Sequence, residues 1–245
     1  MTDGWTERGG VRLHYLEHGR GHSGPVPVVV VPGMGERATE YEWLLEALPE
    51  RHTIAVDVRG RGPSDAPGHG YRWEDHAGDV VAAVDAAGLD RPVLVGFSRG
   101  SSYLLGYLFA HHRPARGLVV GDYAARHVGL PPEVLPRQLE QVLRGVPMSE
   151  RMPEVAVRGV VMEGQEVPLW DRLAELAFPV LVVRGGRRGS MVSDEVAAQW
   201  RAALPSVEIA LLEHAGHDLW SRDRDAYLAV LRPFLARVDA AVSTI

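Results

Sequence analysis

Short apolar runs rich in β-branched residues alternate with longer segments of helical periodicity from residue 26 onward, and this rhythm limits the possible folds more than any other feature. Most of the later runs are apolar at every position, as expected for parallel strands that helices cover on both faces. Strands alternating with helices are typical of a doubly wound α/β sheet. The runs lie at residues 28–31, 53–57, 93–96, 117–121, 179–183 and 207–212, and the helical segments at 38–48, 73–87, 99–112, 169–177, 193–204 and 223–238.

The segment before the first run has a different pattern. Residues 5–7 and 11–17 alternate between polar and apolar positions around Gly9-Gly10, which predicts an antiparallel hairpin. We therefore expect an α/β fold with a mostly parallel central sheet of about eight strands and helices on both faces. Nothing in the 245 residues resembles a linker between independent domains, so residues 1–245 are expected to form one domain.

Residues 124–167 interrupt this rhythm just after the run at 117–121. The segment is rich in proline, and its charges occur at i, i+4 spacing, which favours short helices with a solvated charged face over a strand. The spaced pairs are Glu133 with Arg137, Glu140 with Arg144, and Glu154 with Arg158. We expect residues 124–167 to form a small helical cap, inserted after the sixth strand over the carboxyl ends of the strands. Most of its apolar residues should pack within the cap itself.

Composition excludes several classes of function. The formal net charge of −6 and the lack of a basic cluster argue against a nucleic-acid partner. The chain has no Cys and no Lys, which excludes disulfides, thiolate nucleophiles and Schiff-base chemistry. Residues 1–10 lack the apolar core of a signal peptide and no apolar run could cross a bilayer, so we expect a cytoplasmic protein without a membrane partner. The absence of Lys and Asn indicates a GC-rich, bacterial genome, an inference about codons alone.

A candidate catalytic motif follows the run at 93–96. Gly96-Phe97-Ser98-Arg99-Gly100 has the strand, turn and helix context of a nucleophile elbow, in which a Ser stands at the tip of a sharp turn. Glycine is needed on both sides because the turn brings backbone segments too close for a Cβ atom. The helix N-terminus also favours negative charge beside the Ser. Ser98 is therefore the candidate nucleophile, the alternative being a glycine-rich turn with an incidental Ser.

A Ser nucleophile needs a base, and two histidines follow the run at 207–212. His217 lies in a short glycine-containing loop before the last helical segment, where the chain order Ser, acid, His places the base. His214 lies nearer the strand and is interpreted as a structural turn residue. We expect no metal site on this pair, because the carboxylates and cysteines that would complete it are missing.

Together with the segment DVRGRGPSD at residues 57–65, these motifs make the chain resemble the α/β-hydrolase superfamily over nearly its whole length. The resemblance implies a serine hydrolase that acts on a small molecule without a cofactor. It also implies that backbone N–H groups of Met34 and Arg99 form an oxyanion hole. Pro32 stands where the family usually has a His, but main-chain donors do not depend on that side chain. We interpret Arg59, Arg61 and Ser64 as parts of a buried loop that braces the site.

The acid of the triad is harder to identify. The family most often places it in the loop that is here 184–192, but this loop has no Asp where one is expected, around Ser190. Asp194 comes a little later, in a stretch typical of a helix cap and first turn. Asp122 follows another strand after which some members of the superfamily carry their acid, and it is the preferred partner for Nδ1 of His217. Asp194, or a dyad without an acid, is the alternative.

The expected reaction is acyl transfer to water, in which Ser98 attacks an ester or related carbonyl and His217 moves the proton. The same pocket could also serve a lyase, a cofactor-free oxygenase or a ligand-binding protein without turnover. A further alternative is an NAD-binding oxidoreductase, since Gly33-Met34-Gly35 and Asp57 match a dinucleotide fingerprint. Pro32 fits that fingerprint poorly. The sequence leaves open the identity of the substrate and the choice between monomer and homodimer.

Overall fold

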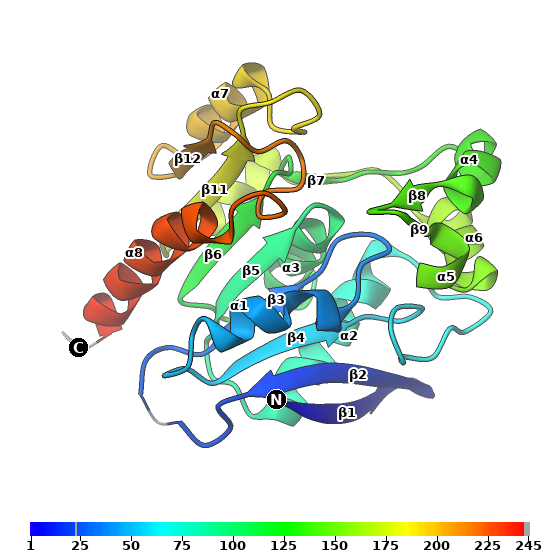
Figure 1. Cartoon of the computed structure of the whole chain (residues 1–245), viewed down its shortest axis with the longest axis horizontal. Coiled ribbons are helices and arrows are strands. Elements are labelled where there is room, and N and C mark those ends of the chain that lie inside the picture. Colours follow the sequence, from blue (N-terminus) through cyan, green and yellow to red (C-terminus); the bar gives the residue numbers. More distant parts are fainter. Residues whose placement is uncertain (23, 243–245) are drawn as a thin grey trace.

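A computed structural model of the protein describes residues 1–22 and 24–242. Its centre is an eight-stranded sheet with the strand order β1-β2-β4-β3-β5-β6-β11-β12 (Figure 1). The strands are β1 (Thr2–Arg8), β2 (Val11–His18), β3 (Val28–Val31), β4 (Thr53–Asp57), β5 (Val93–Phe97), β6 (Gly117–Gly121), β11 (Val180–Gly185) and β12 (Glu208–Leu212). β2 runs antiparallel to β1 and β4, and the other neighbours are parallel. The predicted fold class, including the N-terminal hairpin, is confirmed.

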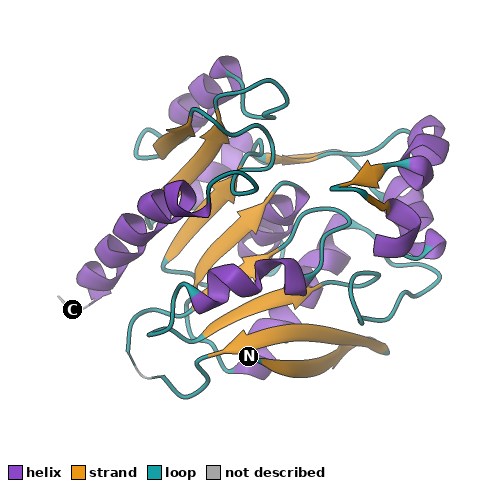
Figure 2. Cartoon of the chain, viewed as in Figure 1, coloured by secondary structure: helices purple, strands orange, loops and turns teal. Residues whose placement is uncertain are grey.

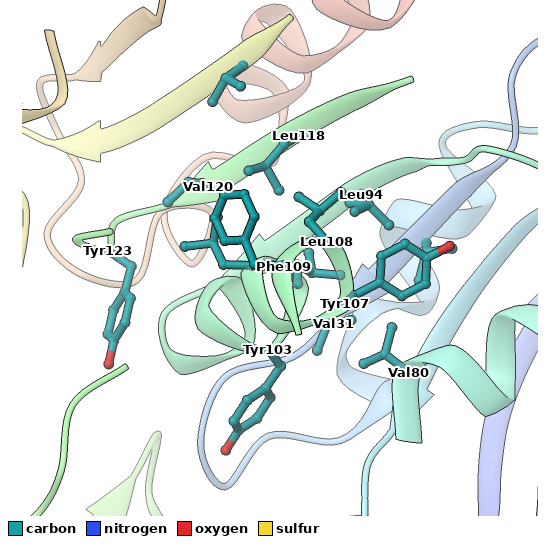
Figure 3. Packing of buried hydrophobic residues seen from close by; sticks show 14 of the residues in the cluster. Val31, Val80, Leu94, Tyr103, Tyr107, Leu108, Phe109, Leu118, Val120 and Tyr123 are labelled. Atoms are coloured by element: carbon teal, nitrogen blue, oxygen red, sulfur yellow. The ribbon is translucent and has the colours of Figure 1, made fainter. Parts of the chain in front are cut away.

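Helices cover both faces of the sheet (Figures 1 and 2). On one face lie α2 (Trp73–Ala87), α3 (Arg99–Phe109) and α7 (Asp194–Ala203), and on the other α1 (Glu42–Glu46) and α8 (Arg224–Val242). Alternate residues of a strand point to opposite faces, so Val29 of β3 belongs to the first core layer and Val30 to the second. Figure 3 shows the first layer, in which side chains of α3 pack against residues of β5 and β6.

Two predicted helices have a different form in the structure. The segment at 38–48 is a 3-10 turn, η1 (Ala38–Tyr41), followed by the short α1, and the segment at 169–177 is the 3-10 helix η3 (Trp170–Glu175). The backbone N–H of Ala38 donates to the buried carboxylate of Asp57 at 2.8 Å, which ties the start of η1 to the end of β4. Periodicity alone does not reveal such a tertiary contact. No helix within the described residues is long and apolar enough to span a membrane.

Residues 124–167 lie beyond the carboxyl ends of the strands (Figure 1). The expectation of helices alone is wrong, because two short strand pairs accompany them, β7 with β10 and β8 with β9. The elements are β7 (Arg126–His127), η2 (Pro132–Val134), α4 (Leu135–Glu140), β8 (Val142–Leu143), β9 (Val146–Pro147), α5 (Met148–Arg151), α6 (Glu154–Glu163) and β10 (Val167–Pro168). Arg144 and Gly145, with φ of 51° and 78°, form the two-residue turn that pairs β8 with β9.

The cap shares a small core with Tyr71, which precedes α2. This core consists of Tyr71, Met148, Met152, Ala156, Val157 and Val160. Most apolar cap residues therefore pack as expected, although Val142 and Met162 are 59% and 60% exposed. Of the charge pairs read as a solvated face, Glu154 and Arg158 do form one on α6, at 2.6 Å. For Arg144 the expectation of a solvated pair with Glu140 is wrong, because Arg144 binds Glu36 and Asp218, which lie outside the cap.

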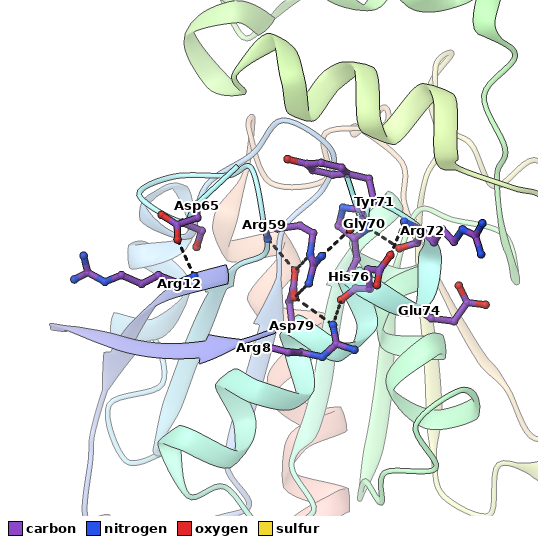
Figure 4. Close-up of polar contacts among 12 residues, drawn as sticks. Arg8, Arg12, Arg59, Asp65, Gly70, Tyr71, Arg72, Glu74, His76 and Asp79 are labelled. Carbon is purple, nitrogen blue, oxygen red and sulfur yellow. Dashed lines mark hydrogen bonds and ion pairs between the residues drawn. The ribbon is translucent and has the colours of Figure 1, made fainter. Parts of the chain in front are cut away.

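Arg59, Arg61 and Ser64 in the loop after β4 are buried, as expected. Figure 4 shows Arg59 beside Asp79. Arg59 forms a bidentate ion pair with Asp79 of α2, with Nη2–Oδ1 and Nε–Oδ2 distances of 2.6 and 2.8 Å. Ser64 Oγ accepts from the backbone N–H of His14 at 2.8 Å and donates to the carbonyl of Asp57 at 2.7 Å. These bonds run to β2, β4 and α2, so the loop supports the sheet beside the site and does not hold Ser98 itself.

Candidate active site

Ser98 stands at a sharp turn between β5 and α3. Its backbone has φ 50° and ψ −130°, a conformation that is strained for any residue with a Cβ. A Cβ on Gly96 would lie 2.5 Å from Cα of Ser101, and one on Gly100 would lie 2.3 Å from the carbonyl oxygen of Pro32. Only glycine fits on either side of the turn, which is the local reason for the motif around Ser98.

Three side chains from distant parts of the chain form a continuous line of hydrogen bonds. Nε2 of His217 lies 3.0 Å from Oγ of Ser98, and its Nδ1 lies 2.8 Å from Oδ2 of Asp122. An ionised carboxylate only accepts hydrogen bonds, so Nδ1 carries the proton and Nε2 accepts from the Ser98 hydroxyl. The three residues follow β5, β6 and β12 at the carboxyl edge of the sheet. The structure thus brings together the three residues that the sequence analysis named.

The Asp122 carboxylate is fully buried and is held by the loop after β11. It accepts from Oγ of Ser190 at 2.5 Å and from the backbone N–H groups of Met191 and Val192 at 2.8 and 3.2 Å. This is the loop in which the family usually carries its acid. Here it supplies donors that orient a carboxylate from the neighbouring strand. From the sequence, Ser190 was considered only as a position at which the expected Asp is absent. Its short polar side chain was the one signal that it could bind a carboxylate from elsewhere.

The alternative residues lie elsewhere. Asp194 begins α7, where its 89% exposed carboxylate pairs with Arg184 at 2.5 Å. The hydroxyl of Ser193 accepts from the N–H of Val196 and so caps the helix. His214 is exposed on the turn after β12. Asp122, and not Asp194, is therefore the carboxylate beside His217.

Two backbone segments lie next to the nucleophile, at Met34 and Arg99. A Cβ on Gly33 would lie 3.3 Å from Cβ of Ser98, so the loop after β3 passes directly beside Ser98. Arg99 is the first residue of α3, and a first-turn N–H has no acceptor within its own helix. The Arg99 guanidinium donates to the carbonyl of Val128 at 2.8 Å. The two segments that carry the predicted main-chain donors therefore lie beside Ser98.

Glu36 is a buried carboxylate that holds the loop after β3. Its Oε2 accepts from the backbone N–H of Gly33 at 2.7 Å and from the Tyr41 hydroxyl at 2.5 Å. Burial raises the pKa of Glu36, although the Arg144 cation and these two donors favour its ionised form. Glu36 was not predicted from the sequence, because an isolated Glu in a glycine-containing loop carries no signal until its partners are known.

A cavity of about 480 Å³ opens at Ser98 and His217. The sheet side contributes Met34, Phe97 and Met191, and the cap closes it with residues of α4, β8 and α5. The apolar cap residues that line the cavity are Leu143 and Met148, and the polar ones are Gln138, Gln141 and Arg144. The cap therefore forms one wall of the space beside the nucleophile.

Arg144 connects the cap to both loops of the site. Its guanidinium binds both oxygens of Asp218, with Nε–Oδ2 and Nη2–Oδ1 distances of 2.7 and 3.0 Å. It also lies 2.9 Å from Oε2 of Glu40 and 2.6 Å from Oε1 of Glu36. Asp218 directly follows His217, and Glu36 holds the loop beside Ser98. The tip of the β8–β9 hairpin is thus anchored to the two loops on either side of the nucleophile.

The geometry offers little to a metal ion or a dinucleotide. Within residues 1–22 and 24–242 there is no group of three or more His, Cys, Asp or Glu side chains suited to a metal ion. The glycines at 33 and 35 lead into the short η1, whereas a dinucleotide fingerprint opens a long helix whose N-terminus binds the pyrophosphate. Asp57 binds the backbone of Ala38 and the ring of His14 within the core. The residues that match the dinucleotide fingerprint therefore make other contacts in this fold.

Comparisons with known proteins agree with this fold. Residues 26–147 match the family model described as alpha/beta hydrolase fold. N-formylmaleamate deformylase of Pseudomonas putida is 26% identical over an alignment of 264 positions, which covers 96% of this chain and 97% of that protein.

Two solved structures resemble this one over almost their whole length. A thermophilic esterase from Thermogutta terrifontis has a TM-score of 0.82 at 19% identity, covering 98% of this chain and 100% of that one. The enol-lactonase from Burkholderia xenovorans LB400 has a TM-score of 0.78 at 20% identity, covering 95% and 100%. At these identities the likeness shows the fold alone. The sheet topology, the elbow at Ser98 and the family match lead to one conclusion: the chain belongs to the α/β-hydrolase superfamily.

Proposed function

We propose that the protein is a serine hydrolase that cleaves an ester or related acyl bond of a small molecule through an acyl-enzyme intermediate. Ser98 is the nucleophile, His217 the general base and acid, and Asp122 the acid of the triad. The observation that carries the proposal is the line of hydrogen bonds from Ser98 Oγ through His217 to the buried Asp122 carboxylate. The named activities of the relatives, an esterase, a deformylase and a lactonase, support the same class of reaction.

In the first half-reaction Ser98 Oγ attacks the carbonyl carbon while Nε2 of His217 takes the hydroxyl proton. The imidazolium that forms is stabilised by Asp122, which also holds the ring in the required tautomer. The same proton then passes from Nε2 to the leaving group, and the acyl group stays on Ser98. In the second half-reaction His217 takes a proton from water, whose oxygen attacks the acyl carbon. The bond from that carbon to Ser98 Oγ then breaks, Nε2 of His217 returns the proton to Oγ, and the acid leaves.

The negative charge on the carbonyl oxygen needs donors already in place. We assign them to the backbone N–H groups of Met34 and Arg99, which belong to the two segments beside Ser98. Glu36 acts as a positioning residue for the first, because it binds the N–H of Gly33 at 2.7 Å and so fixes the loop that carries Met34. The Arg99 N–H lies at the N-terminal end of α3, where the helix dipole also favours the negative charge.

Labelling with a fluorophosphonate probe tests the proposal. The probe reacts with a serine hydroxyl that a neighbouring base activates, so we expect the native protein to be labelled at Ser98 and Ser98→Ala to be unlabelled. Ser102→Ala is a matched control, because Ser102 is a buried hydroxyl of α3 bound to the carbonyl of Arg99 at 2.7 Å. Its labelling should equal that of the native protein. A folded native protein that remains unlabelled at Ser98 would refute nucleophilic catalysis and favour ligand binding or a lyase.

A further inference from the structure

We propose that the cavity at Ser98 accepts uncharged substrates with an apolar acyl group and rejects those that carry a carboxylate on that group. This inference rests on the proposed function and narrows it by naming the substrate class. It is derived from the charges and the apolar side chains that surround the cavity.

The cationic side chain in the cavity is already neutralised. Among the described residues that line the cavity, Arg144 carries the one permanent positive charge. Both oxygens of Asp218 bind its guanidinium, and Glu40 and Glu36 lie at 2.9 and 2.6 Å. Every nitrogen of the guanidinium therefore faces a carboxylate of the protein itself. An incoming substrate carboxylate would have to displace one of them, and Arg144 cannot act as a free receptor for an anion.

The local balance of charge is unfavourable to an anion as well. The three carboxylates around Arg144 face two guanidinium groups, since Arg151 also binds Glu40, with an Nη1–Oε1 distance of 2.7 Å. Glu36 and Asp218 line the cavity themselves. A further carboxylate in this partly buried space would lie beside like charges, which is costly because burial weakens the screening by water.

The remaining walls suit an uncharged acyl chain. Met34, Leu143, Met148 and Met191 supply flexible apolar surface, and thioether side chains adapt to chains of irregular shape. The polar groups on the cap side that carry no charge are the amides of Gln138 and Gln141, which can bind an ester or hydroxyl oxygen without a counter-ion. The lining thus offers apolar contact and neutral hydrogen bonds together.

Two esters of matched size provide the test. p-Nitrophenyl valerate and mono-p-nitrophenyl glutarate have acyl chains of equal length, and the second carries a carboxylate in place of the terminal methyl group. We expect kcat/KM, after subtraction of the spontaneous hydrolysis of each ester, to be on the order of 100-fold higher for the valerate, the size that like-charge contact in a partly buried site produces. Fluorophosphonate labelling of Ser98 is measured on the same preparation.

Charge-neutralising variants show whether the carboxylates around Arg144 cause the preference. In Asp218→Asn and in Glu40→Gln one partner of Arg144 loses its charge, so the relative kcat/KM for the glutarate ester should rise about tenfold in each. Glu154→Gln is the matched control. It removes the same charge from the exposed pair with Arg158 on α6, outside the cavity, and the preference should stay unchanged.

The outcomes separate this inference from the proposed function. If Ser98 is labelled and the glutarate ester is hydrolysed as well as the valerate or better, the substrate class is wrong while the serine hydrolase stands. The same holds if Ser98 is labelled and neither ester is hydrolysed, or if neither Asp218→Asn nor Glu40→Gln changes the preference. If Ser98 is not labelled and neither ester is hydrolysed, the proposed function itself fails.

Discussion

Ser98 and Asp122 both have a positive φ without being glycine, at 50° and 48°. A backbone in this region costs on the order of 1 kcal/mol or more at each residue, so surrounding contacts must hold it. The N–H of Ser98 donates to the carbonyl of Gly121, and the N–H of Asp122 donates to that of Val183, both at 2.8 Å. The hydrogen bonds between strands thus continue one residue past β5 and β6. With this backbone conformation both side chains reach His217.

The first prediction concerns the acid of the triad. Asp122→Asn should lower kcat for p-nitrophenyl valerate by about 10³- to 10⁴-fold, because an amide no longer fixes the tautomer of His217 or stabilises its imidazolium. Asp194→Asn is the control and should change kcat less than twofold, since its carboxylate is exposed and pairs with Arg184. Steady-state kinetics measure the effect, with far-UV circular dichroism as a check on folding. A near-native rate for Asp122→Asn would mean that another group assists His217.

Between elements, the contact that joins the cap to α3 has an unusual histidine at its centre. His127 of β7 is 2% exposed, and its Nδ1 lies 2.9 Å from Oγ of Ser102. Burial, together with the Arg99 cation, lowers the pKa of His127 from 6.5 to about 3. Between these two pH values the His127 ring is therefore neutral in the folded protein and protonated in the unfolded chain.

The second prediction follows from this shift. Between pH 6.5 and about 3 the unfolded chain binds a proton at His127 that the folded chain does not bind, so the free energy of unfolding falls as the pH falls through this window. His127 should contribute a slope of up to about 1.4 kcal/mol per pH unit. Urea unfolding at several pH values should show a shallower acid loss in His127→Gln, which keeps a hydrogen-bonding group for Ser102. Equal slopes in the two proteins would contradict a neutral buried imidazole.

On the scale of the whole molecule, the cap is a small layer added to a complete sheet. The chain enters it through β7 and leaves through β10, and these strands pair antiparallel, with His127 opposite Val167. The N–H of Gly129 still reaches the carboxylate of Glu166, at 3.1 Å. Entry and exit are therefore adjacent, and Ser98 with its two partners comes from loops outside the cap.

The third prediction uses this adjacency. Replacing residues 130–165 by an Asn-Gly turn should leave a protein that still unfolds cooperatively, because both main core layers remain, although its Tm should fall as Tyr71 and Met34 lose their cover. Ser98 should still react with the fluorophosphonate probe. The preference for the valerate ester should not fall, since Glu36, Glu40 and Asp218 lie outside the deleted segment and lose their cationic partners Arg144 and Arg151. Loss of cooperative unfolding in thermal melts would show instead that the cap is required for folding of the sheet.

The parts of the site that the sequence revealed are those with local causes. The elbow at Ser98 needs glycine on both sides because the backbone is crowded there, so its motif can be recognised in the sequence. The loop after β11 is the opposite case, because its lack of an acid became intelligible only when Ser190 was found bound to Asp122 at 2.5 Å. Arg144 was read as half of a helical charge pair, and spacing alone could not show that a two-residue turn directs it away from the cap.

By itself the sequence determined the alternation of strands and helices, the hairpin at the start, the place of the insertion and the turn that exposes Ser98, because each depends on residue periodicity or on close neighbours in the chain. The tertiary structure alone decided which carboxylate meets His217 and which groups neutralise Arg144. His217 is 119 residues from Ser98 and 95 from Asp122 in the chain, and only the order and register of the strands bring them within hydrogen-bonding distance. Contacts across such separations have no local signature.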